Sequence, residues 1–131
     1  MQNKKEAELA KFVLPAGVLD FFSITQIVQT ETTLCIYLEE NNQIPEEYSN
    51  DKLISKGFYE EGMVQDFPIR GKAVHLYVKR RRWLNESTGV YVCRNWDLVA
   101  KGTRMTQEFA SFLKEIIRHQ ANKCKKPGGI L

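Results

Sequence analysis

The feature that most constrains the fold of this 131-residue chain is an alternation of apolar and polar residues from 72 to 83. Successive side chains of a β-strand point to opposite faces of the sheet. One face would carry Val74, Leu76 and Val78, and the other His75, Tyr77, Lys79, Arg81 and Trp83. The pattern predicts a half-buried strand. A turn signal at residues 85–89 and a return at 90–93 predict an antiparallel hairpin over residues 72–93.

A second hairpin is predicted near the N-terminus. Residues 24–29 and 33–38 have strand character and flank the short connection 30–32. In the second segment, Leu34, Ile36 and Leu38 alternate with Cys35, Tyr37 and Glu39. Residues 41–51 are polar and predict an exposed loop. Residues 53–66 predict a strand that is interrupted at Gly57 and Gly62. Residues 67–71 predict a turn.

The best helix signal lies at residues 103–119, where apolar residues recur at helical spacing with Thr106 as the predicted N-cap. Its apolar face comprises Phe109, Phe112, Leu113, Ile116 and Ile117. A shorter helix is predicted over residues 6–14, ended by Pro15, and the apolar residues 18–22 are predicted to cap the core. The expected fold is therefore α+β: a small antiparallel sheet with the C-terminal amphipathic helix packed on it and a short N-terminal helix. It would form one domain over residues 1–121, followed by a basic flexible tail at 122–131.

Charge is unevenly distributed along the chain. Residues 1–70 hold 6 Lys and Arg against 12 Asp and Glu, whereas residues 71–131 hold 13 against 4, so a net charge of +3 conceals a basic second half. Such asymmetry is typical of proteins that bind nucleic acid or an anionic membrane. Nucleic acid is favoured here, because the basic residues follow strand and loop patterns and no basic amphipathic helix is evident.

The densest basic segment, Lys79 to Arg82, continues directly from the apolar strand. Arginine favours bidentate contact with phosphate, and neighbouring aromatics can stack on bases. The alternative is a solvated strand end whose charges pair with the acidic half. Trp96 is interpreted as a core anchor under the helix rather than a stacking residue. The predicted DNA-binding set is Lys72, His75, Tyr77, Lys79, Arg80, Arg81, Arg82, Trp83, Arg94, Lys101 and Arg104.

Within that set, the alternation separates two groups. Lys79 and Arg81 share a face with Tyr77 and His75 and are the strongest candidates. Arg80 and Arg82 would continue the apolar face, so they must leave the core at the sheet edge or line a groove.

Neither catalysis nor metal binding is predicted. The chain has no nucleophile motif and no phosphate-binding glycine loop, and its carboxylates suit turns and caps. His75, His119, Cys93 and Cys124 lack the paired CxxC spacing of structural zinc sites. Three widely spaced cysteines argue against a disulfide scaffold and indicate a reducing, cytoplasmic setting, with each cysteine a small buried hydrophobe. No stretch is long and apolar enough for a membrane span, and no signal peptide is evident.

Three stretches carry a family resemblance: DFPIRGKAVHLYVKRRRW at residues 66–83, RNWDLVAKGTRMT at 94–106 and FASFL at 109–113. Together they resemble the N-terminal region of bacterial insertion-sequence transposases of the ISL-three type, most closely the ISAon group of Bacteroidetes. The resemblance covers residues 66–113 strongly and 13–39 more loosely. In that family the region carries a zinc ribbon, precedes helix-turn-helix and DDE catalytic parts, and binds the terminal repeats of the element.

This chain departs from the family pattern in two respects. LNESTG at residues 84–89 stands where a zinc-binding CxxC would be, and no DDE domain is present in the sequence. The resemblance therefore implies a metal-free, non-catalytic DNA-binding partner of a separate DDE transposase polypeptide. Two alternatives remain: a protein-interaction module that docks the transposase through its acidic half and sheet edge, and a decayed fragment of an element.

Overall fold

The structure is a computed structural model that describes residues 13–102 and 107–120, the side chains of 100–102, 119 and 120 excepted. The predicted helix at 6–14, the N-cap Thr106 and the tail at 122–131 fall mainly or wholly outside these residues.

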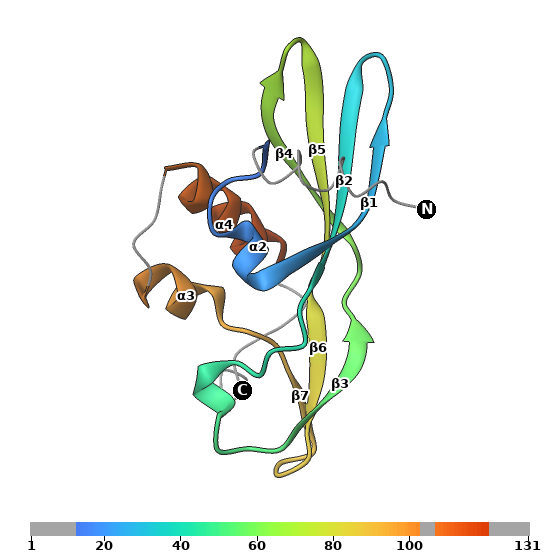
Figure 1. Cartoon of the computed structure of the whole chain (residues 1–131). Helices are drawn as coiled ribbons and strands as arrows, with labels where there is room; N and C mark the ends of the chain where they lie inside the picture. The colour runs from blue at the N-terminus through green and yellow to red at the C-terminus, as the bar shows by residue number, and fades with distance from the viewer. Residues whose placement is uncertain (1–12, 103–106, 121–131) are drawn as a thin grey trace.

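Among the described residues, seven strands form two sheets (Figure 1). Sheet A has the order β1-β2-β5-β4, with β1 Phe22–Gln29, β2 Thr33–Glu40, β5 Lys72–Lys79 and β4 Gly62–Ile69. Sheet B has the order β3-β6-β7, with β3 Leu53–Phe58, β6 Arg81–Asn85 and β7 Val90–Val92. The helices in this part of the chain are α2 Val18–Phe21, the 3-10 turn η1 Glu46–Tyr48, α3 Trp96–Gly102 and α4 Gln107–Gln120. The expected α+β class is confirmed, including the C-terminal helix and a short helix near the N-terminus.

The predicted N-terminal hairpin is present, since β1 pairs with β2 antiparallel. Of the hairpin predicted over residues 72–93, only β6 and β7 pair with each other, because the strand divides at Arg80 and β5 pairs with β2 and β4 instead. The pairing of β2 with β5 is parallel, so the expectation of a purely antiparallel sheet is wrong at this position. This pair joins the acidic and basic halves of the chain at the centre of sheet A. A parallel pair needs a long crossover, here residues 41–71, and nothing in a local pattern indicates it.

A long bent ribbon links the two sheets. β4 pairs with β5 in sheet A and β3 pairs with β6 in sheet B, so residues 53–85 form one hairpin that changes sheets at its middle. The Tyr59 N–H donates to the Arg80 carbonyl oxygen over 2.8 Å and continues the ladder across the bend. The predicted turn at residues 67–71 is shorter than expected: β4 extends to Ile69, and only Arg70 and Gly71 form the turn, both with positive φ.

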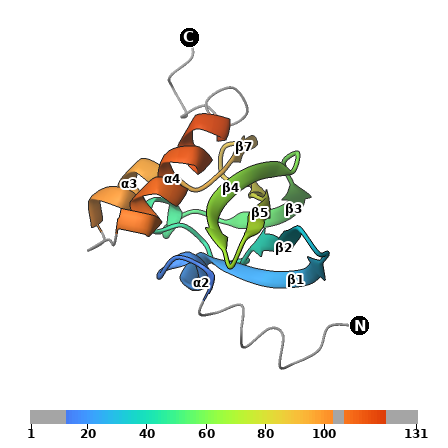
Figure 2. The same cartoon turned by 90° about the horizontal axis from the view of Figure 1, so that it is seen from above.

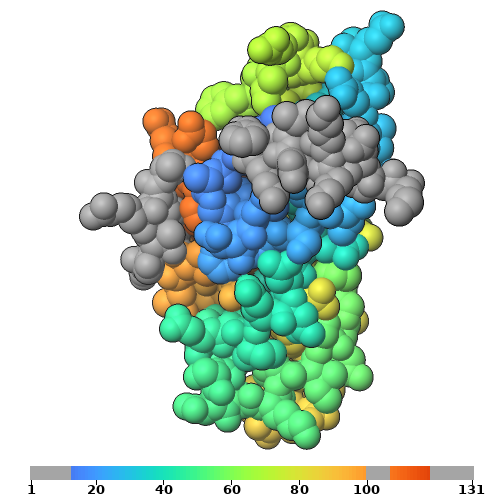
Figure 3. Space-filling model, viewed as in Figure 1, coloured from blue at the N-terminus to red at the C-terminus, as the bar shows by residue number. Residues whose placement is uncertain are grey.

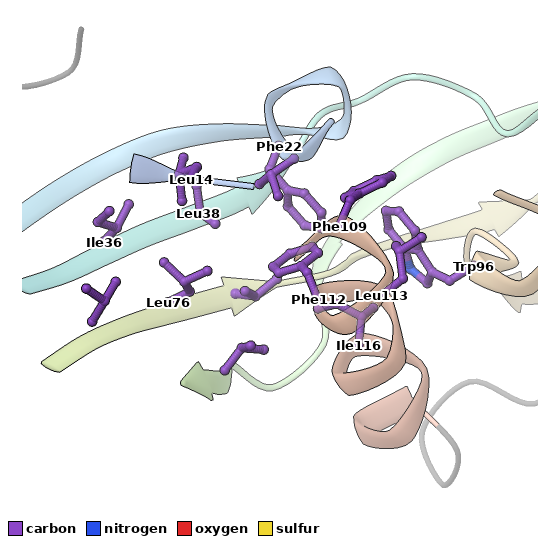
Figure 4. Close-up of a cluster of buried hydrophobic side chains, with 14 residues drawn as sticks. Leu14, Phe22, Ile36, Leu38, Leu76, Trp96, Phe109, Phe112, Leu113 and Ile116 are labelled. Atoms are coloured by element: carbon purple, nitrogen blue, oxygen red, sulfur yellow. The ribbon is translucent and has the colours of Figure 1, made fainter. Parts of the chain in front are cut away.

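The helices cover one face of sheet A, as Figure 2 shows. The core lies between them and the strands, where Ile36, Leu38 and Leu76 face α4 (Figure 4). Phe109, Phe112, Leu113 and Ile116 of α4 are buried there, which confirms the predicted apolar face of the helix.

Trp96, the first residue of α3, confirms the core-anchor interpretation. It is buried, its ring stacks on Phe22 with centroids 5.5 Å apart, and it meets Phe21 edge-on at 5.4 Å. The helix α3 itself was not predicted, because its 7 residues, about two turns, are too few to show a clear period.

Candidate nucleic-acid interface

The arginine run lies where the bent ribbon changes sheets. Arg80 stands between β5 and β6, is only 3% exposed, and has its guanidinium carbon 5.6 Å from the centre of the Tyr59 ring. Its Nη1 has no hydrogen-bond partner among the described residues. Burial lowers the pKa of Arg80, and the nearby carboxylate of Glu40 opposes that change.

Arg81 is bound to the end of β2. Its backbone N–H donates to Oε1 of Glu40 over 2.9 Å, and its Nε donates to the Glu40 carbonyl oxygen over 3.0 Å. Nη1 donates to Oγ of Ser55 over 2.6 Å, and the guanidinium lies 4.6 Å from the centre of the Phe58 ring. The side chain thereby joins sheet B to sheet A.

Arg82 and Trp83 also have partners within the fold. Nε and Nη2 of Arg82 donate to the carbonyl oxygen of Lys56 over 3.2 and 3.1 Å, and the guanidinium lies 4.9 Å from the Tyr91 ring centre. Trp83 is fully buried, and its Nε1 donates to Oδ1 of Asn42 over 2.9 Å.

Arg94 forms a buried ion pair with Glu40. Its Nε lies 2.7 Å from Oε2 of that carboxylate, and Nη2 donates to the Gln43 carbonyl oxygen over 2.7 Å. The guanidinium is within 6 Å of the ring centres of Phe21, Trp83 and Trp96. Burial raises the pKa of Glu40, while the hydrogen bond and charge of Arg94 lower it.

These positions correct part of the predicted DNA-binding set. Arg80, Trp83 and Arg94 are buried and cannot reach a phosphate in this structure. The alternation that placed Trp83 beside Tyr77 breaks at Arg80: residues 74, 76, 78 and 80 are buried, and then 83 and 85. A shift of one residue moves every later side chain to the other face of the strand. The Lys101 side chain and all of Arg104 lie outside the described residues.

A different group of predicted residues shares the face of sheet A opposite the helices, which we call the open face. His75, Tyr77 and Lys79 of β5 alternate there with the buried residues of the same strand. Lys72 lies at the end of the sheet, where its Nζ donates to the Thr30 carbonyl oxygen over 2.8 Å. That bond joins the β1–β2 and β4–β5 turns, which project together at one end of the molecule (Figures 1 and 3).

The centre of the open face is a stacked pair of tyrosines. Tyr37 of β2 and Tyr77 of β5 are register partners, and their rings are nearly parallel, at 13°, with centroids 4.8 Å apart. His75 meets Tyr77 edge-on at 6.4 Å. Tyr37 was not among the predicted site residues. The alternation in residues 33–38 assigns it to the face opposite Ile36, but only the parallel pairing of β2 with β5 brings it to Tyr77.

The charges on the open face nearly balance. Lys79 is the register partner of Glu39. Partial burial raises the pKa of Tyr37, and Cys35, Tyr77 and Glu61 add to that rise. A neutral tyrosine ring with a carboxylate nearby is suited to stacking rather than to phosphate contact.

The cysteines and a possible metal site are the remaining features. Cys35 is half-buried and free, whereas Cys93 is buried and disulfide-bonded. Cys93 is buried, as expected, but it is not the free thiol that a reducing setting predicts. Within residues 13–102 and 107–120, no group of three or more His, Cys, Asp and Glu side chains is arranged to hold a metal ion. No helix in this part of the chain is long and apolar enough to cross a membrane.

Comparison with known proteins identifies no relative. No family model, no curated protein and no solved structure matches this chain.

Proposed function

We propose that this chain is a non-catalytic DNA-binding protein that acts at the ends of an insertion sequence, beside a separate DDE transposase polypeptide. The observation that carries DNA binding is the open face, where Tyr37 and Tyr77 stack beside His75 and Lys79. The transposase context rests on the resemblance at residues 66–113. In proteins that bind nucleic acid, aromatic rings stack on bases and neighbouring cations contact the phosphate backbone.

The test is a binding titration of the purified chain with a duplex of the terminal repeat and with a scrambled duplex, across a salt series. Lys79→Ala is expected to weaken binding and to reduce the salt slope by about one ion. The matched control is Lys114→Ala, which removes an equally charged, exposed lysine from α4 on the other side of the sheet. Equal affinity and slope for the parent chain and Lys79→Ala would remove the open face from the proposal.

A second candidate function is docking of the transposase polypeptide. It is favoured by Phe67, which is 65% exposed on the edge strand β4. Beside it, a groove of about 580 Å³ runs between β4 and α4 and is lined by Asp66, Phe67, Glu108 and Lys114, among others. Aromatic residues, Phe among them, are enriched in protein interfaces relative to the rest of the surface.

Phe67→Ser is expected to abolish co-purification with the DDE polypeptide at high salt, because removing a central aromatic anchor typically costs more than about 2 kcal/mol of binding. Val90→Ser, which removes an exposed apolar side chain from sheet B, is the control. Retention of the complex by Phe67→Ser would exclude this groove as the docking site.

A further inference from the structure

The open face supplies few cations for the backbone of duplex DNA. A duplex presents one negative charge per roughly 1.7 Å of its axis, and proteins that bind it through phosphates typically neutralise several of them. On the open face, Lys79 stands beside Glu39, and Glu61 is near enough to affect Tyr37. Other arginines of the predicted set have partners within the fold. Arg81 and Arg82 donate to backbone carbonyl oxygens, and Arg94 is paired with Glu40.

The same face does match unpaired bases. Aromatic side chains at the centre of an exposed sheet stack bases that have left a helix, and this contact needs few cations. The Tyr37–Tyr77 pair occupies the two central strands, β2 and β5, of the four-stranded sheet. Because the rings stack on each other, a base would extend the stack from either outer ring face.

The neighbours of the two rings provide space and polar groups for a base. Gln26 of β1 is in register with Tyr37, and Met63 of β4 is in register with Tyr77; both are exposed. Gln65 is exposed in register with His75. The amides of the two glutamines can both donate to and accept from a base edge, which is free only when the base is unpaired.

We propose that the open face binds unpaired nucleotides, stacked on the Tyr37–Tyr77 pair, in preference to duplex DNA. This inference rests on the proposed nucleic-acid function and specifies its ligand. Its ligand at an element end would be nucleotides that have separated from their partner strand.

The test compares three fluorescent probes with the full chain: an oligothymidine of about 12 nucleotides, an oligouridine of the same length and a duplex of the same length. The oligothymidine is expected to bind at least tenfold more tightly than the duplex, with a shallow salt dependence because few cations take part. Tyr77→Leu is expected to weaken oligothymidine binding by about tenfold, equivalent to about 1.4 kcal/mol. Tyr91→Leu, the same substitution at an exposed tyrosine of sheet B, should leave it unchanged.

The outcomes separate this inference from the proposed function. Tighter binding to the duplex, unaffected by Tyr77→Leu, would overturn the inference and leave DNA binding in place. Binding to oligouridine alone, lost in Tyr77→Leu, would support the inference and overturn the assignment to DNA. Failure of all three probes to bind would overturn the inference, and the titration with the terminal repeat would then decide DNA binding by itself. Circular dichroism and thermal unfolding of each variant verify that a loss of binding is not a loss of fold.

Discussion

Glu40→Gln is expected to lower the free energy of unfolding by about 3–5 kcal/mol, because it removes the charge that compensates a buried guanidinium. Glu40 is 1% exposed, and Oε2 lies 2.7 Å from Nε of Arg94, which is itself 7% exposed. Oε1 accepts the N–H of Arg81. Glutamine keeps the shape of the side chain but presents an amide donor to one of these donors. Urea unfolding followed by tryptophan fluorescence measures the change.

Arg80→Met is the contrasting variant for this ion pair. Arg80 is as buried as Arg94, but its Nη1 has no hydrogen-bond partner among the described residues. Replacing a poorly compensated buried ion with an apolar side chain of similar size is often neutral or stabilising. We expect the free energy of unfolding to fall by less than about 1 kcal/mol, or to rise. If Glu40→Gln and Arg80→Met lowered the free energy of unfolding equally, Arg94 would not be the principal partner of Glu40.

Trp96→Ala is expected to lower the free energy of unfolding by about 3–5 kcal/mol, which is the range for truncating a buried tryptophan to alanine. Trp96 is 1% exposed and joins α3 to the core through its contacts with Phe22 and Phe21. Alanine would leave a cavity between α3 and the strand β1. The same unfolding measurement applies, with Trp83 remaining as the fluorescent reporter.

Trp96→Phe is the control, because it retains an aromatic ring against Phe22. Its free energy of unfolding should fall clearly less than that of Trp96→Ala. A loss below about 1 kcal/mol for Trp96→Ala would show that the core closes around the missing side chain, against the expected cavity cost.

The strands and the C-terminal helix could be predicted from the sequence because their signals are local. Alternation at residues 72–79 correctly assigned Val74, Leu76 and Val78 to the core. Helical spacing correctly assigned Phe109, Phe112, Leu113 and Ile116. In both cases, backbone geometry sets the interval at which side chains return to the same face, so apolar residues at that interval reveal the buried face. The turn at Arg70 and Gly71 was placed too early because Phe67 and Pro68 interrupt the alternation while remaining in the strand.

The environment of the arginines could not be predicted from the sequence. Arg81 and Arg94 meet Glu40, which is 41 and 54 residues away, and no local pattern records such a pair. A run of basic residues therefore has the same sequence whether it faces solvent or joins two sheets. In this fold the change of sheet at Arg80 decides between these possibilities, because it reverses which alternate residues are buried.

From the sequence alone, most strands and the long C-terminal helix could be located, together with the side of each that faces the core, since side-chain periodicity follows from backbone geometry. The tertiary structure alone decided which strands pair, and so decided the candidate site. The parallel register of β2 with β5 brings Tyr37 beside Tyr77. The bend at Arg80 buries Trp83 and brings Arg80, Arg81 and Arg82 into contacts within the fold. Pairing between distant segments depends on the whole chain closing around one core, and no stretch of residues encodes it locally.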